Sequence, residues 1–396
     1  MELDVLIFGG GGAGLWLLDE LHRRGFGALL MERTALGTGQ TIACQGILHG
    51  GLKYSLAGAL TDSAKAIRNL PALWRQCLQG DRPPDLTRTT VLSPCCYLWR
   101  TQSVKSKLGI VGARIGLQCG AHRVSAESRP AVLAACPGDV FRVDEQVIDV
   151  ASFLRDLADQ HRDRLLQISP DHEVTFDRSS WGRIDRVRVT APDPSSVWEL
   201  SPRTIVFTAG AGNAELRERA GLSADAMQRR PLHMVLVRGE LPDLFGHCVD
   251  GAKTRVTITS ARDGAGRVVW QVGGQLSETG VEMESSALLE FAKQELRAVL
   301  PGVSFADAEW STYRIDRAEM KTDRGLRPAG AVLQQERSVI TAWPTKFVLV
   351  PELARMIADL LPEPSIGSGQ PPTIPDDWPR PDVALPPWEA PGQWRE

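Results

Sequence analysis

The sequence predicts an α/β fold, because the parts of a nucleotide-binding βαβ unit follow one another at its start. Residues 5–8 are an apolar, strand-like run, the glycine-rich segment 9–14 follows it, and residues 15–24 have the character of a helix. A second apolar run, Ala28–Met31, ends on Glu32. A glycine-rich turn between strand and helix, with an acid after the second strand, is typical of the Rossmann-like dinucleotide-binding unit. An ordinary glycine-rich loop would explain the turn but not the elements around it.

Each part of the G-x-G-x-x-G motif has a physical task in holding a dinucleotide. Gly9 permits the tight turn after the strand, Gly11 lets the backbone approach a pyrophosphate, and Gly14 lets the helix pack closely on the sheet. The helix N-terminus faces the phosphates. Glu32 lies 18 residues after Gly14, where its carboxylate can accept hydrogen bonds from a ribose, which favours FAD or NAD over NADP. We therefore expect the cofactor to contact Gly9, Gly11, Gly12, Ala13, Gly14, Glu32 and Arg33.

The segment after Glu32 decides between FAD and NAD. A nicotinamide enzyme usually continues into another short βα unit, whereas residues 34–54 have no helical or alternating period and are rich in Gly, Thr and Gln. Such a loop can lay backbone amides and small side chains along a pyrophosphate and a flavin ring. The sequence therefore predicts FAD.

The same loop resembles that of a known family. Gln40-Thr41 and the run Gly46–Tyr54 are similar to the flavin loop of the D-amino-acid oxidase (DAO) superfamily of FAD-dependent oxidoreductases. Leu48–Tyr54 follows the Ile-His-Gly-Gly-Leu-Arg-Tyr string of the FAD-dependent glycerol-3-phosphate dehydrogenase branch, and Gln40-Thr41 with Gly46–His49 resembles the L-2-hydroxyglutarate oxidase branch. Further similar segments follow in the family's order at residues 147–154, 205–212, 266–274, 342–347 and 351–354.

The resemblance implies a Rossmann-like FAD-binding domain interleaved with an antiparallel-sheet substrate-binding domain. We expect residues 1–85, 145–225 and 325–361 in the first, 86–144 and 226–324 in the second, and a Pro/Trp-rich tail at 362–396. Apolar periodicity predicts helices at 57–68, 70–78, 103–110, 149–167, 286–299 and 352–361 and strands at 183–190, 205–208 and 339–343. Three tryptophans in the tail favour packing on the surface over disorder.

The resemblance also implies further FAD contacts. They are Gln40, Thr41, Gln45, Gly46, Leu48, His49, Gly50, Val174, Ala209, Gly210, Pro344, Thr345 and Lys346. Lys346 resembles the lysine whose positive charge stabilises the reduced, anionic flavin. We expect non-covalent FAD, because Gly50-Gly51 follows His49 as in relatives that hold the cofactor without a covalent bond.

Flavin-dependent oxidation of a C–H bond needs a clamp for the charged end of the substrate. Arg314 lies 28 residues before Ala342, which resembles the spacing of the family's substrate-binding arginine. A guanidinium can bind an oxyanion with two parallel hydrogen bonds. Arg327, in a literal Gly-Leu-Arg-Pro string, lies only 15 residues before Ala342, which is too close for the family's spacing. Arg314 is therefore preferred, with Arg327 as the competing candidate.

The reaction also needs a group that accepts a proton. His49 lies in the flavin loop, and an imidazole can take a proton near neutral pH. A single histidine is otherwise more often a structural hydrogen-bonding residue. Lys53 and Tyr54 follow in the loop, where they either reach the substrate or only pack.

Composition excludes several other classes of protein. The 396 residues carry 45 basic and 48 acidic side chains, so no broad cationic surface for nucleic acid is expected. Seven cysteines without C-x-x-C spacing argue for a reducing compartment and against a disulfide framework or a structural metal site. No apolar run approaches the ~18 residues of a membrane span, and the chain begins in a strand rather than a signal peptide. We expect a cytoplasmic protein, peripheral to a membrane if a quinone is its electron acceptor.

Together these features predict an FAD-dependent oxidoreductase that oxidises a small oxyanion-bearing substrate. An α-hydroxy acid (2-hydroxyglutarate-like) or a glycerol-phosphate-like alcohol would pass a hydride to flavin N5, and the electrons would go to oxygen or a quinone-type acceptor. An amino-acid or amine oxidase of the same superfamily and a non-catalytic flavin-binding protein are the alternatives.

Overall fold

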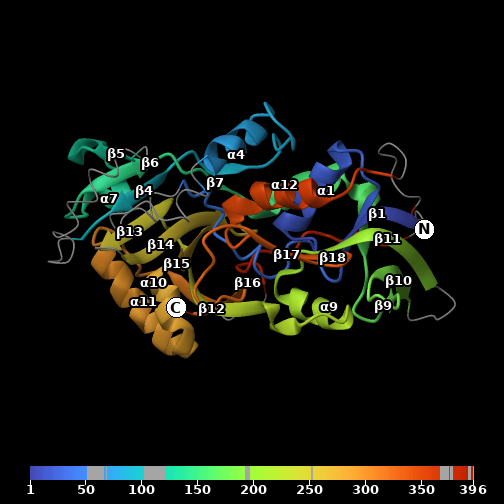
Figure 1. Cartoon of the computed structure of the whole chain (residues 1–396). Coiled ribbons are helices and arrows are strands. Elements are labelled where there is room, and N and C mark those ends of the chain that lie inside the picture. Colours follow the sequence, from blue (N-terminus) through green and yellow to red (C-terminus); the bar gives the residue numbers. More distant parts are fainter. Residues whose placement is uncertain are drawn as a thin grey trace.

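Two large β-sheets with helices on their outer faces make up the protein (Figure 1). The computed structural model describes residues 1–50, 67, 69–101, 121–191, 197–250, 253–365, 374, 378–390 and 394–395. Within these residues the chain forms two eight-stranded sheets and one two-stranded sheet. The expected mixed α/β fold is confirmed.

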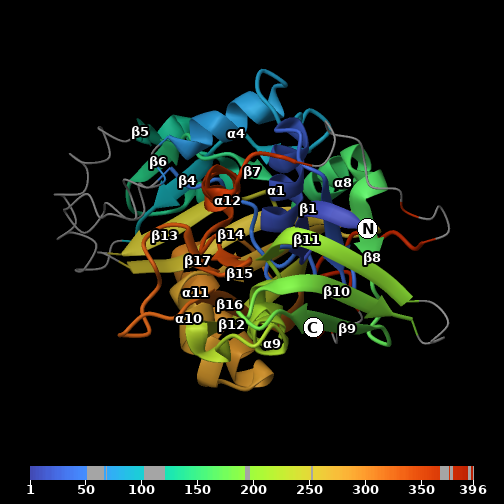
Figure 2. The same cartoon turned by 45° about the vertical axis from the view of Figure 1, so that its right-hand side comes forward.

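The first sheet contains the nucleotide-binding unit that the sequence predicts. Its strands are β1 Glu2–Phe8, β2 Ala28–Glu32, β8 Leu165–Gln167, β9 Glu173–Arg178, β10 Ile184–Thr190, β11 Val197–Phe207, β17 Val332–Glu336 and β18 Val339–Trp343. The order is β17-β18-β11-β1-β2-β8, and β10 and β9 continue from β11. The path from β18 to β8 is parallel, whereas β17, β10 and β9 pair antiparallel. Figure 2 shows β11, β10 and β9 side by side.

Helices α1 (Gly12–Arg23), α8 (Val150–Gln160) and α12 (Val350–Leu360) pack together on this sheet. α1 follows β1 directly and buries an apolar stripe that includes Leu15, Leu18 and Leu21. α8 begins where the side chain of Asp149 accepts hydrogen bonds from the backbone N–H groups of residues 151 and 152. Two shorter helices, α4 Leu70–Leu78 and α9 Asn213–Arg219, lie at the edges.

The expected helix at 149–167 is wrong in its second half. α8 ends at Gln160, and Leu165–Gln167 instead form β8, which pairs in parallel with β2. The adjacent Leu165 and Leu166 fit a buried parallel strand as well as a helix, and a short apolar run does not distinguish the two. The other expected elements among the described residues are confirmed within a few residues, except that β11 begins at Val197, earlier than expected. The helices expected at 57–68 and 103–110 lie outside the described residues apart from Ile67.

The second sheet is antiparallel except for one parallel pair, β13 with β4. Its strands are β4 Cys96–Trp99, β5 Ala121–Val124, β6 Val140–Val143, β12 Met227–Gly239, β13 Gly246–Asp250, β14 Lys253–Arg262, β15 Val268–Gly273 and β16 Glu309–Met320, in the order β16-β12-β15-β14-β13-β4-β6-β5. Helices α10 (Gln275–Thr279) and α11 (Ser285–Val299) pack on one face, where they cover Val235, Trp270 and Val272. The remaining elements are α7 Ala131–Ala134 and the pair β3 Val91–Ser93 and β7 Val147–Ile148.

The chain crosses between the two sheets several times. Strands of the first sheet come from residues 2–32, 165–207 and 332–343, and strands of the second from 96–143 and 227–320. The domain limits expected from the sequence stay a prediction.

The C-terminal tail packs on both sheets, which confirms the expectation of a surface-packed tail. The ring of Trp378 stacks on Trp198 at 4.2 Å, and its indole N–H donates to the carbonyl of Gln167. Further along, the tail forms a parallel bridge with Leu36, whose N–H donates to Asp382 at 2.7 Å. Arg395 then pairs with Trp310 of β16. The tail therefore connects the first sheet to the second.

Candidate active site

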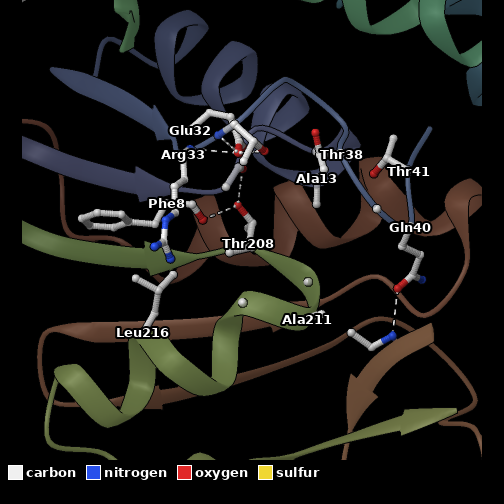
Figure 3. A pocket seen from close by; sticks show the side chains of 18 of the residues that line it. Phe8, Ala13, Glu32, Arg33, Thr38, Gln40, Thr41, Thr208, Ala211 and Leu216 are labelled. Carbon is white, nitrogen blue, oxygen red and sulfur yellow. Dashed lines mark hydrogen bonds between the residues drawn. The ribbon is translucent and has the colours of Figure 1, made fainter. Parts of the chain in front are cut away.

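A pocket of about 590 Å³ lies at the carboxyl ends of β1, β2 and β11, and residues of β16 and of the segment after β18 also line it (Figure 3). The carboxyl end of a parallel sheet is where α/β proteins bind nucleotides. The expected cofactor contacts that line it are Gly9, Gly11, Ala13, Glu32, Arg33, Gln40, Thr41, Val174, Ala209, Gly210, Pro344 and Lys346. The expected contacts outside its lining are Gly12, Gly14, Gln45, Gly46, Leu48, His49, Gly50 and Thr345. Residues that sequence reasoning missed include Thr34, Thr38, Ser169, His172, Thr208 and Phe347.

The turn between β1 and α1 has no room for side chains at two of its glycines. Gly9 has a φ of +106°, and a Cβ placed on it would lie 2.5 Å from the Cα of Ala209. A Cβ on Gly14 would lie 2.0 Å from the carbonyl oxygen of Gly9. The hydroxyl of Thr208 donates to that same oxygen, at 3.0 Å, and so ties the end of β11 to the turn. The two glycines therefore allow helix, turn and β11 to meet beside the pocket.

The carboxylate of Glu32 is held in place at the end of β2. One oxygen accepts the backbone N–H of Gly10 at 2.7 Å, and the other accepts those of Arg33 and Thr34 at 2.9 and 3.0 Å. Figure 3 shows Glu32 and Arg33 together at the pocket wall. These hydrogen bonds fix the direction of the carboxylate, whose oxygens can also accept hydrogen bonds from a ribose.

The flavin-loop segment is bonded to the second sheet by two glutamines. The side-chain oxygen of Gln40 accepts the backbone N–H of Ala318 in β16 at 2.9 Å (Figure 3). The side-chain nitrogen of Gln45 donates to the carbonyls of Thr257 and Gln271 at 3.1 and 2.8 Å. At the other end, the Thr41 hydroxyl accepts the N–H of Gly12 at 3.3 Å. The loop therefore joins the phosphate turn to the sheet opposite.

A tyrosine on β16 faces this loop, and sequence reasoning missed it. The Tyr313 hydroxyl donates to the carbonyl of Ala43 at 3.1 Å and accepts a hydrogen bond from the side chain of Gln271. Burial raises the pKa of Tyr313 well above its usual value, so the phenol stays neutral.

Arg314, the next residue of β16, points to the opposite face of the sheet. Its guanidinium is exposed and donates to the carbonyls of Val281 and Met283 at 2.7 and 2.8 Å. Successive residues of a strand alternate between faces, so Arg314 and Tyr313 diverge. Arg314 borders the pocket, but both ends of its guanidinium already bind backbone oxygens. Arg327 is not among the residues that line the pocket, but its charge acts on Lys346, which does line it.

Lys346 lies at the pocket end formed by the segment after β18. Desolvation by burial, with a smaller contribution from the positive charge of Arg327, lowers the pKa of Lys346 to about 7, although Glu319 acts in the opposite direction. Glu319 is itself fully buried and receives two hydrogen bonds from Arg230, at 2.7 and 2.8 Å. A buried lysine near a second cation gains stability when an anion approaches both.

His49, which does not line the pocket, belongs to a polar cluster in which it is half-buried and its two partners are buried. Its Nδ1 lies 3.2 Å from a carboxylate oxygen of Glu145, and the backbone N–H of Gly50 donates to the other oxygen at 2.7 Å. The ring of His247 lies 5.5 Å from that of His49, and the candidate ligand atoms of these three side chains all lie within 4.8 Å of one another. Two imidazoles and a carboxylate are a donor set that can also bind a divalent metal. Sequence reasoning found only His49, because Glu145 lies between β6 and β7 and His247 lies on β13, both far from the loop in sequence. Lys53 and Tyr54 lie outside the described residues.

Comparison with known proteins identifies the family. The DAO family, described as FAD dependent oxidoreductase, matches residues 4–360. The chain belongs to this family.

The relatives of this DAO-family chain agree with that assignment. A probable FAD-dependent oxidoreductase of Pseudomonas aeruginosa is 36% identical over 395 residues, with 98% of each chain covered. The crystal structure of the FAD-dependent oxidoreductase from that organism has a TM-score of 0.81, at 34% identity and 98% coverage of each chain. The FAD-bound L-α-glycerophosphate oxidase of Mycoplasma pneumoniae has a TM-score of 0.65 at 15% identity, covering 95% of this chain and 99% of that one. The expected family, cofactor and enzyme class are confirmed, whereas the branch within the family is not determined.

The pocket of this DAO-family enzyme fits FAD. Glu32 presents its carboxylate where the adenosine ribose would bind, and the glycines of the turn at Gly9–Gly14 leave the backbone accessible to the pyrophosphate. Lys346 lines the same pocket and would help to hold the cofactor. No helix of the described residues is long and apolar enough to cross a membrane.

Proposed function

We propose that this DAO-family enzyme oxidises a small alcohol that carries a carboxylate or a phosphate. An α-hydroxy acid resembling 2-hydroxyglutarate is the first substrate class, and a glycerol-phosphate-like alcohol is the second. The observation that carries the proposal is the pair of cationic side chains, Arg327 and Lys346, close enough for the charge of one to lower the pKa of the other. Lys346 lines the pocket, and a cationic side chain there, with the charge of Arg327 acting nearby, attracts an oxyanion-bearing substrate.

Arg327 is the proposed clamp, and Arg314 is the competitor. The guanidinium of Arg314 binds two backbone carbonyls, on the face of β16 opposite Tyr313. Arg327 lies near the buried Lys346, which lines the pocket. A guanidinium stays charged at any physiological pH and matches the two oxygens of a carboxylate. The clamp therefore orients the substrate carbon that loses hydride.

His49 is the proposed proton acceptor. Bound FAD supplies the two-electron acceptor for the hydride that leaves the substrate carbon. His49 takes the hydroxyl proton as the C–O double bond forms, which is the role of a general base. Because the pKa of Lys346 is about 7, negative charge that develops beside it favours the protonated, positively charged form of its side chain. Lys53 and Tyr54 stay candidates for substrate contact.

Anaerobic reduction of the purified yellow protein tests the substrate class. Lactate, 2-hydroxyglutarate and glycerol 3-phosphate are added separately to the holoenzyme without oxygen, and the visible flavin absorption is followed. At least one of them should bleach the flavin. Bleaching by glycine or sarcosine alone would instead show the amine oxidase that the sequence leaves as an alternative. Oxygen uptake with and without an added quinone then separates the two expected electron acceptors.

A further inference from the structure

We propose that Thr345 is a positioning residue that places Lys346 in the cofactor pocket. Its side-chain hydroxyl holds the turn after β18 in a left-handed backbone conformation, and this turn sets where the next residue lies. The resemblance to the family implies instead that Thr345 contacts FAD directly. The inference concerns the cofactor pocket alone and is the same for either proposed substrate class.

The side chain of Thr345 is bonded to the protein rather than directed at the pocket. Pro344 and Lys346 line the pocket, whereas Thr345 between them does not. Thr345 is only 5% exposed, and its hydroxyl donates to the carbonyl of Gly330 at 2.9 Å, in the loop that joins β16 to β17. A buried hydroxyl is stable only when it finds such a partner. Thr345 therefore supports the turn from outside the pocket.

The backbone of Thr345 has a conformation that threonine rarely adopts. Its φ is +59°, and across it the N–H of Lys346 donates to the carbonyl of Pro344 at 2.7 Å. A hydrogen bond from residue i+2 back to residue i closes a γ-turn, and the form with a positive φ at the central residue is rare and strained. A side chain that branches at Cβ makes this region still less favourable. Such a conformation persists only where surrounding contacts hold it, and it occurs most often at ligand sites.

The other described non-glycine residue with a positive φ has a different explanation. Arg337, with a φ of +58°, is exposed and lies in the two-residue hairpin between β17 and β18, where Glu336 pairs with Val339. Two-residue hairpins favour positive φ values, because such turns match the twist of the paired strands. The turn at Thr345 instead leads from β18 into the helical segment after it. Strand pairing therefore does not account for the conformation of Thr345.

The turn holds Lys346 by its backbone and by its side chain. Its N–H closes the γ-turn, and its carbonyl accepts the N–H of Leu349 at 3.0 Å. Its Nζ lies 3.5 Å from the carbonyl oxygen of Ala329, which precedes the Gly330 that binds Thr345. Two successive carbonyls of the β16–β17 loop therefore hold two successive residues of the turn. Because Lys346 is only 8% exposed, a turn that relaxes would displace its side chain from the pocket wall.

The affinity of the protein for FAD tests the inference. Holoenzyme is diluted in steps, free FAD is separated by ultrafiltration, and the apparent Kd is compared among wild type, Thr345→Val, Thr345→Gly and Thr345→Ser. Valine keeps the shape of threonine but removes the hydroxyl, so the Kd should rise by roughly 5–10-fold, as for the loss of one hydrogen bond. Glycine relieves the backbone strain but cannot bond to Gly330, so the Kd should rise here too. Serine keeps the hydroxyl and should stay within about twofold of wild type.

These variants separate the hydroxyl from the backbone conformation. A wild-type Kd in Thr345→Val or in Thr345→Gly would overturn the proposal, and so would a loss in Thr345→Ser as large as that in Thr345→Val. Urea unfolding establishes that each variant is folded. If Thr345→Val does not fold, Thr345→Gly carries the test, because glycine adopts a φ of +59° without strain.

A double variant shows whether Thr345 acts through Lys346. Lys346→Met should itself raise the Kd for FAD, and Thr345→Val should add little to that change, because two changes in one contact are not additive. Additive losses would show that Thr345 acts independently of Lys346. An unchanged Kd in Lys346→Met would show that Lys346 does not hold the cofactor. Either result would overturn the proposal.

The matched control is Thr89→Val, which removes the hydroxyl of another buried threonine. Thr89 is 6% exposed, donates to a carboxylate oxygen of Asp156 at 3.0 Å, and is not among the residues that line the pocket. This variant should lower the urea midpoint without changing the Kd for FAD. An equal rise in Kd would show that general loss of stability explains the effect, and would overturn the positioning role. None of these measurements uses a substrate, so a failure of the proposed function would leave them unaffected.

Discussion

Replacing Gly14 with alanine has two opposing effects on stability: a gain in helix propensity and a loss of packing at the turn between β1 and α1. Alanine is intrinsically better than glycine inside a helix, by roughly 0.5–1 kcal/mol, so propensity alone would make Gly14→Ala stabilising. In the structure the new methyl would lie 2.0 Å from the carbonyl oxygen of Gly9 and 2.9 Å from the hydroxyl of Thr208, whereas ordinary contact begins at 3.4 Å. The first obstacle is backbone, so α1 must move away from the turn.

Packing should prevail, with a net loss of about 1–3 kcal/mol in the free energy of unfolding, as is typical of overpacked interiors. Urea unfolding of the FAD-free protein measures this loss. The displacement of α1 should also lower the affinity for FAD, which an FAD titration measures. Gly12→Ala is the matched control in the same helix, because its methyl would approach side chains and no backbone: the rings of Phe347 and Phe153 at 3.2 and 3.4 Å and the methyl of Thr41 at 3.7 Å. The reasoning would be refuted if Gly14→Ala proved as stable as Gly12→Ala and bound FAD equally well.

Three further outcomes follow from the geometry of the pocket. Glu32→Gln should weaken FAD binding by about 1–3 kcal/mol, or roughly 5–150-fold, because one charged acceptor is lost, and a fluorescence titration showing unchanged affinity would contradict this. The pKa of Lys346 is lowered from 10.5 to about 7, so between these pH values the unfolded FAD-free chain binds one more proton than the folded chain, and the free energy of unfolding decreases as the pH falls. The stability of Lys346→Met relative to wild type should therefore increase as the pH falls from 10.5 to about 7 and stay constant below about pH 7. A stability difference that does not change with pH would refute the assignment. Acid precipitation should leave the yellow colour in the supernatant, whereas colour in the pellet would show FAD bound covalently.

The parts of the fold that the sequence predicts are those that local patterns determine. The turn at Gly9–Gly14 and the run Val339–Trp343 carry their signal within a few residues, and both lie where expected. The short apolar run Leu165–Leu166 is compatible with a helix when read locally, and it becomes a strand only by pairing with β2. The packing of the tail depends on Trp198, on a strand far away in sequence.

The candidate site likewise contains residues that local sequence patterns predict and residues that they do not. The motif residues near Glu32 could be named from spacing alone, since turn, helix and strand end are consecutive. Glu145 and His247 could not, because the segment after β6 and strand β13 meet the flavin loop only in the folded protein. Spacing also placed Arg314 near the pocket but could not show that its side chain turns to carbonyl groups on the other face of β16.

The central claim is that an arginine beside Lys346 clamps the oxyanion of an alcohol substrate during flavin reduction. Anaerobic stopped-flow measurements on wild type, Arg327→Ala and Arg314→Ala, with 2-hydroxyglutarate and glycerol 3-phosphate as substrates, test it most directly. We expect the apparent substrate Kd to rise by roughly 10–100-fold in Arg327→Ala, as for loss of a charged hydrogen bond of about 1.5–3 kcal/mol, and to stay near wild type in Arg314→Ala. A raised Kd in Arg314→Ala with wild-type behaviour in Arg327→Ala would contradict the account.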